Sequence, residues 1–384
     1  MTRTFVHQFE PKNEAPKGAG AEVELTVRQI EDAGYQEMLQ TSGARLSSWS
    51  ILDALLEQGV VPFVFKQPLG IAREVKVAAS GLFGRFVARA YLTRYLGLTF
   101  FGHLGSKKIK LDATQEVEIL RKKGTRGDLP DWVASSGGVN DLTVAEAKGC
   151  HDSGGPDARL KHAWKQAQRV NVLADGKRLT VKRIAIVTRW ASAAGGAKVP
   201  MIGVRDPVDE GDPDAPNKLD HAAVGIARLH MANLLEPLGF TELAHSIHSL
   251  LIRHRHRPRE KTDVRGSRVD DALSALDQVR PRYIFGRALG SASPSEGLIG
   301  SFLTRAGPLR AGAVTQGTIR SLRELELRPI FVGVERSVLA AIIRGNPEEI
   351  RNLTQRERAS QDSDVSIDPA GTRVVHLSER IGIE

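Results

Sequence analysis

Residues 129–149 read LPDWVASSGGVNDLTVAEAKG, and this stretch decides the fold that we expect. Two short apolar runs, 129–135 and 142–148, flank a segment rich in Ser, Gly, Asn and Asp, which is the pattern of two strands joined by a turn. In the second run, strand periodicity places Glu146 and Lys148 on the same face. The two charged side chains are therefore expected to be neighbours.

The register of this hairpin determines where Asp131 lies. If the hairpin is centred between Gly138 and Val139, paired residue numbers sum to 277, and Asp131 stands opposite Glu146. Opposed residues have Cβ atoms about 4.5–5.5 Å apart, and two like charges in that position are destabilising. A divalent ion would neutralise them, and Mg²⁺ suits a site made of two carboxylates, a main-chain carbonyl and waters.

Position on the chain distinguishes Glu146 and Lys148 from similar triplets. An acid followed two residues later by a lysine occurs at Glu10–Lys12, Glu74–Lys76, Glu146–Lys148 and Asp175–Lys177. The first stands beside a proline in a polar segment, the second has no Pro-Asp pair upstream, and the last lies in a turn that closes a helix. The remaining triplet lies on an expected strand and follows Pro130-Asp131.

The surrounding sequence predicts an α/β protein. Apolar periodicity and Gly, Asp and Asn boundaries predict a helix at 82–96, strands at 116–120, 129–135 and 142–148, a helix at 157–174 and a strand at 181–190. The expected order is helix, three strands, helix, strand.

This order and the spaced acids resemble the PD-(D/E)xK phosphodiesterase superfamily, which has the restriction-endonuclease-like fold. The likeness covers about residues 82–204. The resemblance implies that Asp131 and Glu146 are metal ligands, that the Ala147 carbonyl is a further ligand, and that Lys148 is the catalytic lysine. Many members also carry a glutamate in the first core helix, and the segment 82–96 contains no acid.

Polar residues on the helix after the third strand are candidates for substrate binding, because members of this family often have one that reaches toward the site. Lys161, Lys165 and Gln168 form a line at helical spacing, and Gln166 is another candidate. A solvated helix flank would have the same pattern, so both interpretations stay open.

Composition narrows the class of function. The net charge is +9, which favours a polyanionic partner such as nucleic acid, although a merely basic protein has the same balance. A single cysteine, Cys150, excludes an intrachain disulfide and a CxxC metal site. Without an apolar leader or a bilayer-length apolar run, we expect a cytoplasmic protein with no membrane partner. The basic stretch 253–268 either grips phosphates or is a solvated loop.

We expect four regions along the chain. These are an N-terminal arm and helical region at 1–75, a nuclease-like core at 76–205, an acidic linker at 206–220 and a C-terminal α+β region of unknown role at 221–384. Within the first, residues 1–24 suggest a loose arm and 45–58 a helix. The C-terminal region is a candidate for contact with a partner protein or a second copy.

The functional prediction is a metal-dependent nuclease that uses Mg²⁺ or Mn²⁺ and acts on nucleic acid, most naturally DNA. A role in bacterial defence or restriction follows by analogy with other nucleases of this fold. The alternative is a catalytically inactive protein that keeps the fold as a nucleic-acid-binding or assembly module.

Overall fold

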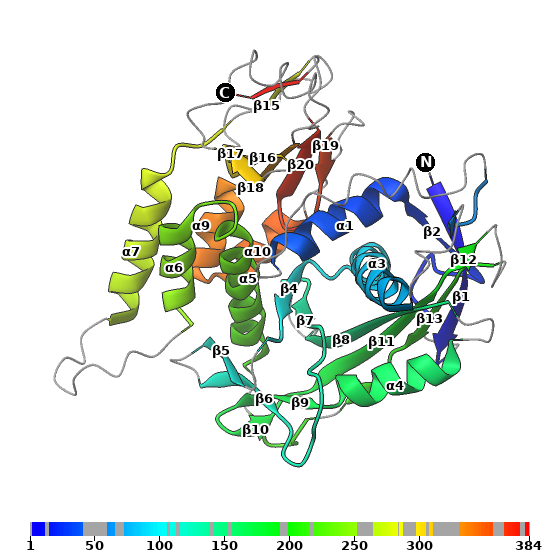
Figure 1. Ribbon diagram of the computed structural model, residues 1–384. Coiled ribbons are helices and arrows are strands. Elements are labelled where there is room, and N and C mark those ends of the chain that lie inside the picture. Colours follow the sequence, from blue (N-terminus) through cyan, green and yellow to red (C-terminus); the bar gives the residue numbers. More distant parts are fainter. Residues whose placement is uncertain are drawn as a thin grey trace.

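The protein is mixed α/β, with a large sheet at its centre (Figure 1). The computed structural model describes residues 2–11, 15–40, 60–65, 73–105, 108–112, 116–137, 142–151, 156–192, 199–209, 211–215, 218–251, 264–282, 284–286, 297–304, 307–309, 330–355, 365–376 and 381–383. The eight-stranded sheet has the order β2-β1-β13-β11-β8-β7-β4, with β14 paired to β11. Its strands are β1 (Thr2–Glu10), β2 (Glu22–Thr26), β4 (Phe100–His103), β7 (Trp132–Ser135), β8 (Thr143–Cys150), β11 (Val181–Arg189), β13 (Met201–Arg205) and β14 (Val208–Asp209).

Two helices cover opposite faces of this sheet. Helix α3 (Arg73–Leu96) packs on β8 from one side, and α4 (Asp157–Ala167) packs on β8 and β11 from the other (Figure 1). Helix α1 (Val27–Leu39) lies against α3 and begins with a capping box, in which Thr26 and Gln29 exchange side-chain and backbone hydrogen bonds. Strand β11 is buried along most of its length because α3 and α4 cover its two faces.

The helix, three strands, helix, strand order is present, but with one strand exchanged. The sequence assigned 116–120 as the first of the three strands, whereas β6 (Val117–Arg121) belongs to a separate sheet. Its place beside β7 is taken by β4, a four-residue strand that sequence patterning missed because it is so short. The order is therefore α3, β4, β7, β8, α4, β11.

The predicted helix 157–174 is too long. Helix α4 ends at Ala167, and Val170–Ala174 forms strand β9. Val170 continues the apolar stripe expected of the helix, but on β9 it is buried on the same face as Val172, and both pair with β6. Their β-branched side chains suit that pleated surface.

A second sheet, β10-β9-β6-β5, extends below the main one (Figure 1). It adds β5 (Lys108–Asp112) and β10 (Lys177–Arg178) to β6 and β9. The acidic segment expected as a linker lies along this sheet. Asp212 and Asp214 contact Arg178 and Lys177, and the buried Asp206 accepts a hydrogen bond from Lys182. Charge complementarity thus attaches the start of the predicted linker to the core.

The loose arm expected at residues 1–24 is wrong for most of its length. Strand β1 pairs in parallel with β13 and antiparallel with β2, so the N-terminus forms one side of the main sheet. Alternate residues of β1 are buried, and two of them, Arg3 and His7, are polar. Because these two buried positions are polar, the alternation of apolar residues that would have indicated a strand is interrupted.

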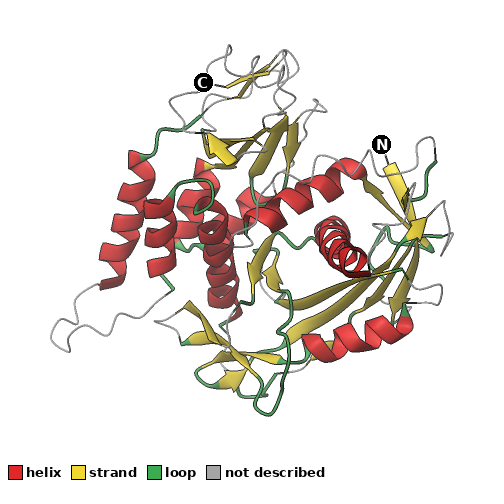
Figure 2. Cartoon of the chain, in the orientation of Figure 1, coloured by secondary structure: helices red, strands yellow, loops and turns green. Residues whose placement is uncertain are grey.

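The C-terminal region is α+β, as predicted. It contains helices α5 (Leu219–Leu235), α6 (Thr241–Ser249), α7 (Val264–Gln278), α9 (Arg336–Arg344) and α10 (Pro347–Gln355). Beside them lies a sheet of order β17-β16-β18-β20-β19, formed by Gly307–Leu309, Leu298–Thr304, Ile330–Glu335, Thr372–His376 and Val365–Ile367 (Figure 2). The short pairs β3 (Val64–Phe65) with β12 (Ala191–Ser192), and β15 (Ile284–Gly286) with β21 (Ile381–Ile383), complete the strands described.

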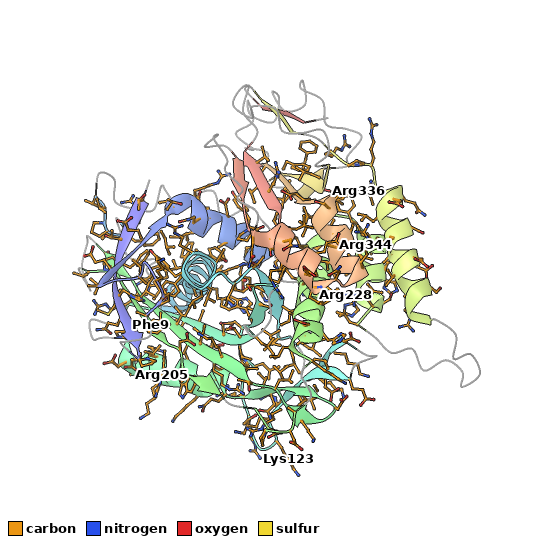
Figure 3. All side chains as sticks on the ribbon, turned by 180° about the vertical axis from the view of Figure 1, so that it is seen from behind. Phe9, Lys123, Arg205, Arg228, Arg336 and Arg344 are labelled. Atoms are coloured by element: carbon orange, nitrogen blue, oxygen red, sulfur yellow. The ribbon has the colours of Figure 1, made fainter. Side chains whose placement is uncertain are left out.

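A buried arginine joins two of these helices. Arg228 of α5 donates from Nε to the Ile342 carbonyl (3.1 Å) and from Nη2 to the Ile343 carbonyl (2.8 Å), near the end of α9 (Figure 3). These bonds satisfy carbonyls that a helix end leaves free.

Among the described residues, no helix has the length and apolar character needed to cross a bilayer. The helix predicted at 45–58 lies outside the described residues.

Helix α3 meets β8 through two glycines, and this contact fixes the helix directly over the strand. A Cβ atom on Gly149 would lie 2.0 Å from the Ser80 carbonyl oxygen, and one on Gly84 would lie 2.7 Å from the Gly149 nitrogen. Both distances are far below van der Waals contact, so only glycine allows the two backbones to approach this closely.

We predict that Gly84→Ala lowers the free energy of unfolding by about 1–3 kcal/mol, the usual cost of overpacking, and that Gly149→Ala lowers it further. In the described part of the chain, no neighbouring atom lies within 4 Å of the position that a Cβ on Gly81 of the same helix would take, so Gly81→Ala should raise stability by about 0.5–1 kcal/mol. Urea unfolding followed by tryptophan fluorescence measures all three. Equal effects at Gly81 and Gly84 would contradict the close contact.

Candidate active site

Asp131 and Glu146 lie side by side, in the predicted register. Strands β7 and β8 pair Trp132 with Ala145 and Val133 with Val144, so the paired numbers sum to 277 as expected. The Asp131 backbone N–H donates to Glu146 Oε2 (3.0 Å), and the Ala147 N–H donates to Asp131 Oδ2 (2.8 Å). Each carboxylate is therefore held by a backbone group from the other strand.

Two side-chain cations form ion pairs with these carboxylates. Arg85 of α3 places Nη2 2.7 Å from Asp131 Oδ1, and Lys148 Nζ contacts Glu146 Oε1. All four carboxylate oxygens thus have a partner within the protein. The sequence predicted that the opposed acids require neutralisation, and here Arg85 and Lys148 supply it.

Access to this cluster is uneven. The Glu146 side chain is fully buried, whereas the side chains of Asp131, Arg85 and Lys148 are 14%, 28% and 31% exposed. Burial, and then the charge of Asp131, raises the pKa of Glu146 to about 8, although Lys148 and the Asp131 N–H act in the opposite direction. A solvent molecule or ligand would therefore reach the cluster from the side of Arg85 and Lys148.

A third carboxylate, Glu37 of α1, lies fully buried behind Arg85 and was not predicted from the sequence. Four groups surround it: Arg85 Nε at 3.4 Å, Arg89 Nη1 at 3.4 Å, His103 Nε2 at 3.3 Å and the donating Trp132 Nε1 at 3.1 Å. Burial alone would raise the pKa of Glu37, but His103, Arg85 and Arg89 hold it at about 2. Glu37 is thus an anion that binds side chains from α3, β4 and β7.

One signal in the sequence could have revealed this network. Arg85 and Arg89 stand four residues apart on a helix segment that contains no acid, so a buried arginine there needs a counter-charge from another element. Arg89 is almost fully buried, and its guanidinium also donates to Gln36 Oε1 (2.6 Å). Sequence periodicity placed both arginines outside the apolar stripe and left their partner unidentified.

Gln166 of α4 has a different position from the one predicted for a substrate-binding residue. Its side chain is buried, and Nε2 donates to the Leu129 carbonyl (2.7 Å), two residues before Asp131. Arg169 Nη1 donates to the Asp128 carbonyl (2.6 Å) in the same segment. Gln166 therefore holds the chain that leads into Asp131 and is not open to a substrate.

The other candidates on α4 lie on its surface. Lys161, Lys165 and Gln168 are exposed, and substrate binding by them stays a prediction. His162, also exposed and not predicted, has a lowered pKa, first because of partial desolvation and then because of Lys148 and the cations of α4. Lys148 therefore lies within electrostatic reach of His162 on α4.

The donor set fits one kind of metal site. Among the described residues, no group of three or more His, Cys, Asp and Glu side chains is placed to hold a metal ion. Mg²⁺ commonly binds through one or two carboxylates together with waters and substrate phosphates, so Asp131 and Glu146 suit such an ion. The part of the Ala147 carbonyl stays a prediction, since the contact described for Ala147 is made by its N–H.

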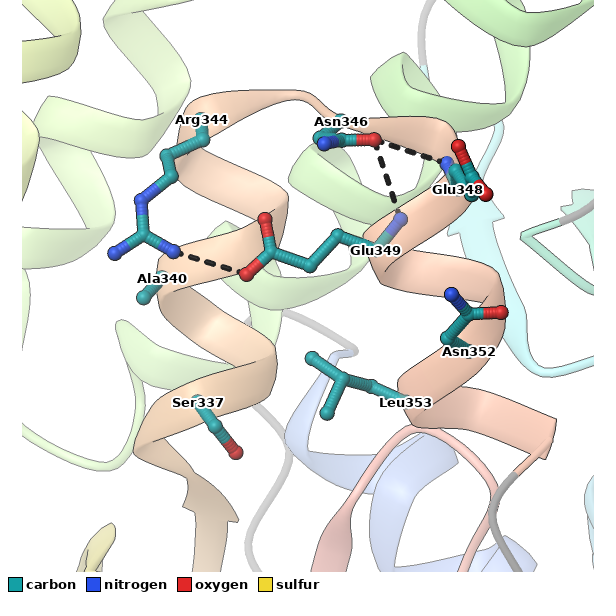
Figure 4. Close-up of a pocket in the computed structure, with 8 residues that line it drawn as sticks. All are labelled: Ser337, Ala340, Arg344, Asn346, Glu348, Glu349, Asn352 and Leu353. Atoms are coloured by element: carbon teal, nitrogen blue, oxygen red, sulfur yellow. Dashed lines mark hydrogen bonds and ion pairs between the residues drawn. The ribbon is translucent and has the colours of Figure 1, made fainter.

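Two other features of the chain lie apart from this cluster. Residues 253–263 of the predicted basic stretch are outside the described residues, and Arg268 belongs to α7, where Nη1 donates to the Ser249 carbonyl (3.5 Å). A pocket of about 500 Å³ lies between α9 and α10, crossed by an ion pair of Arg344 and Glu349 (Figure 4). None of its lining residues belongs to α3, α4, β7 or β8.

Comparison with known proteins gives no relative: no family model, no curated protein and no solved structure matches the chain. A functional assignment therefore has to come from the geometry of the residues themselves.

We predict that Glu37→Gln lowers the free energy of unfolding by about 3–5 kcal/mol near pH 7, because it leaves buried guanidinium groups without their anion. Since the pKa of Glu37 falls from 4.5 to about 2 on folding, its contribution is complete above about pH 4.5 and is lost as the pH falls toward 2. Urea unfolding between pH 2.5 and 7 should show the difference from wild type shrinking at low pH. The exposed Glu242 of α6, changed to Gln, is the control and should have little effect.

Glu146 should have the opposite pH dependence. Its pKa rises from 4.5 to about 8 on folding, so its ionisation costs stability progressively as the pH rises through that range. Glu146→Gln removes this cost, and its stability relative to wild type should increase from pH 5 to pH 8 and then level off. Urea titrations in the presence of a chelator measure the difference. Parallel profiles for the two proteins would contradict a raised pKa.

Proposed function

We propose that this protein is a metal-dependent nuclease that hydrolyses phosphodiester bonds, with DNA as its substrate. The observation that carries the proposal is the pair of carboxylates Asp131, directly before β7, and Glu146, within β8, which are joined by backbone hydrogen bonds and have Lys148 beside them. An Mg²⁺ or Mn²⁺ ion bound there would activate a water molecule and polarise the phosphate. Opposed acids next to a lysine are well suited to this chemistry.

Each residue of the cluster has a part in this proposal. Asp131 and Glu146 hold the ion, and the backbone bonds between them fix their separation before it binds. Lys148, partly exposed, positions the attacking water and offsets the negative charge that develops on the phosphate. Gln166 acts indirectly, because it fixes the segment that carries Asp131.

Two further observations support this function. The sequence of elements α3, β4, β7, β8, α4, β11 is the order found in the restriction-endonuclease-like fold, with Asp131 directly before its second strand and Glu146 on its third. The exposed Lys161 and Lys165 of α4, with Lys148 in electrostatic reach of the same helix, suit a polyanion, as does the net charge of +9. A duplex lying over α4 would bring its backbone to Lys148.

The wider biological role is proposed by analogy alone. Nucleases of this fold with large additional regions serve in bacterial defence and restriction, so we assign this chain the same kind of role in the cytoplasm. Its C-terminal α+β region would then provide contact with a partner protein or with a second copy of the chain.

A second candidate is a nucleic-acid-binding protein that has the fold without the activity. It is favoured by the occupied state of the carboxylates, since Arg85 and Lys148 already neutralise them and the described residues supply no third acid to the pair. Such a protein would bind DNA through α4 and would cleave nothing, with or without a divalent ion.

We expect Asp131→Asn, Glu146→Gln and Lys148→Met each to lower the cleavage rate by about a hundredfold or more, since each removes a group that acts on the metal, the water or the phosphate. Purified protein is incubated with plasmid, single-stranded DNA and RNA in Mg²⁺, Mn²⁺ or chelator. Glu118→Gln on β6, outside the cluster, is the matched control and should cleave normally. Retained DNA binding without metal-dependent cleavage by wild type would favour the inactive alternative.

A further inference from the structure

Arg85 joins the buried anion Glu37 to the candidate metal ligand Asp131. Its Nε lies 3.4 Å from Glu37 Oε1, and its Nη2 lies 2.7 Å from Asp131 Oδ1. The guanidinium also lies over the Trp132 ring, 5.8 Å from its centroid. Arg85 thus occupies the side of Asp131 from which solvent and ligands reach the cluster.

The position of Arg85 is set by its helix. The preceding residue, Gly84, packs directly on the backbone of Lys148 and Gly149, so the α3 backbone at this point is in close contact with β8 and has no room to move toward it. Glu37 holds the inner edge of the guanidinium in addition. A change in the contact with Asp131 therefore has to come from rotation of the Arg85 side chain.

Both carboxyl groups of the cluster have side-chain partners without any ion. Asp131 is paired with Arg85, and Glu146 is paired with Lys148, so two acids face two bases. A divalent cation that approaches Asp131 therefore meets a guanidinium already bound to one of its oxygens. Like charges at this range repel, and a carboxylate oxygen committed to an arginine is a poorer metal ligand.

We propose that Arg85 is a built-in competitor of the metal, the counter-ion of Asp131 that a divalent cation has to displace before the site is loaded. The inference rests on the proposed nuclease function and concerns the regulation of the same site. Once displaced from Asp131, Arg85 stays bound to Glu37 at the opening of the cluster, where the phosphate of a substrate is its natural partner. Substrate binding would then favour metal binding, and by linkage the reverse also holds.

Metal binding to the full-length protein tests this inference without any measurement of activity. Calorimetric titration with Mn²⁺ alone compares wild type, Arg85→Gln, Arg85→Lys and Arg94→Gln, the last an exposed position on the same helix. We expect Arg85→Gln to bind Mn²⁺ about tenfold more tightly, the scale on which a neighbouring charge shifts such an equilibrium. Arg85→Lys, which keeps the charge, should stay close to wild type, and Arg94→Gln should match wild type.

A second measurement does not depend on the folding of the Gln variant. In wild type labelled with ¹⁵N, the arginine Nε signal that is missing from Arg85→Lys belongs to Arg85, and Mg²⁺ should shift it as the guanidinium leaves Asp131. If wild type binds the ion and this signal stays unmoved, or if the Gln variant binds no more tightly than wild type or the Lys variant, the competition is disproved and the nuclease proposal stands. If neither wild type nor Arg85→Gln binds the metal, both are overturned.

Discussion

The buried carboxylate of Glu37 is the interaction on which the arrangement of the candidate site depends. It is a full charge without access to water, and it is stable there because α3 contributes two guanidinium groups, β4 an imidazole and β7 an indole N–H. Burying one ion costs several kcal/mol, so these partners have to converge on it. The packing of α1 and α3 against the strands next to Asp131 and Glu146 therefore depends on the contacts of this one carboxylate.

The sequence predicted one part of this site because the residues of that part are close together in the chain. Asp131, Glu146 and Lys148 lie within one hairpin, and its pairing follows from the alternation of side chains and the position of the turn. Gln166 was identified as a polar residue of interest, but its burial and its bond to Leu129 depend on how α4 lies against the preceding segment. The spacing of residues along one helix contains no information about how that helix packs on another segment.

The part of the site around Glu37 was not predicted, because it depends on contacts between residues that are far apart in the sequence. Glu37 lies far from Arg85 in the sequence, and nothing in the sequence of α1 marks this acid, among several, as buried. Strand β1 was missed for a related reason, since Arg3 and His7 occupy buried positions that an apolar residue would have revealed. Where a buried residue is charged or polar, its partner decides its position, and a single sequence does not name the partner.

The packing of α5 has a consequence for how this protein can be divided. Gly225 brings that helix so close to β5 that a Cβ would lie 2.3 Å from the Leu111 carbonyl oxygen, and Leu229 covers Gly102 on β4, the outermost strand of the main sheet. On the opposite side, β1 and β2 complete the sheet beyond β13. A fragment trimmed to residues 76–205 would expose strand edges on both sides, and open edges invite pairing between chains. The smallest portable unit of this protein, for transfer into a fusion or for evolution by domain shuffling, therefore includes the N-terminal strands and α5.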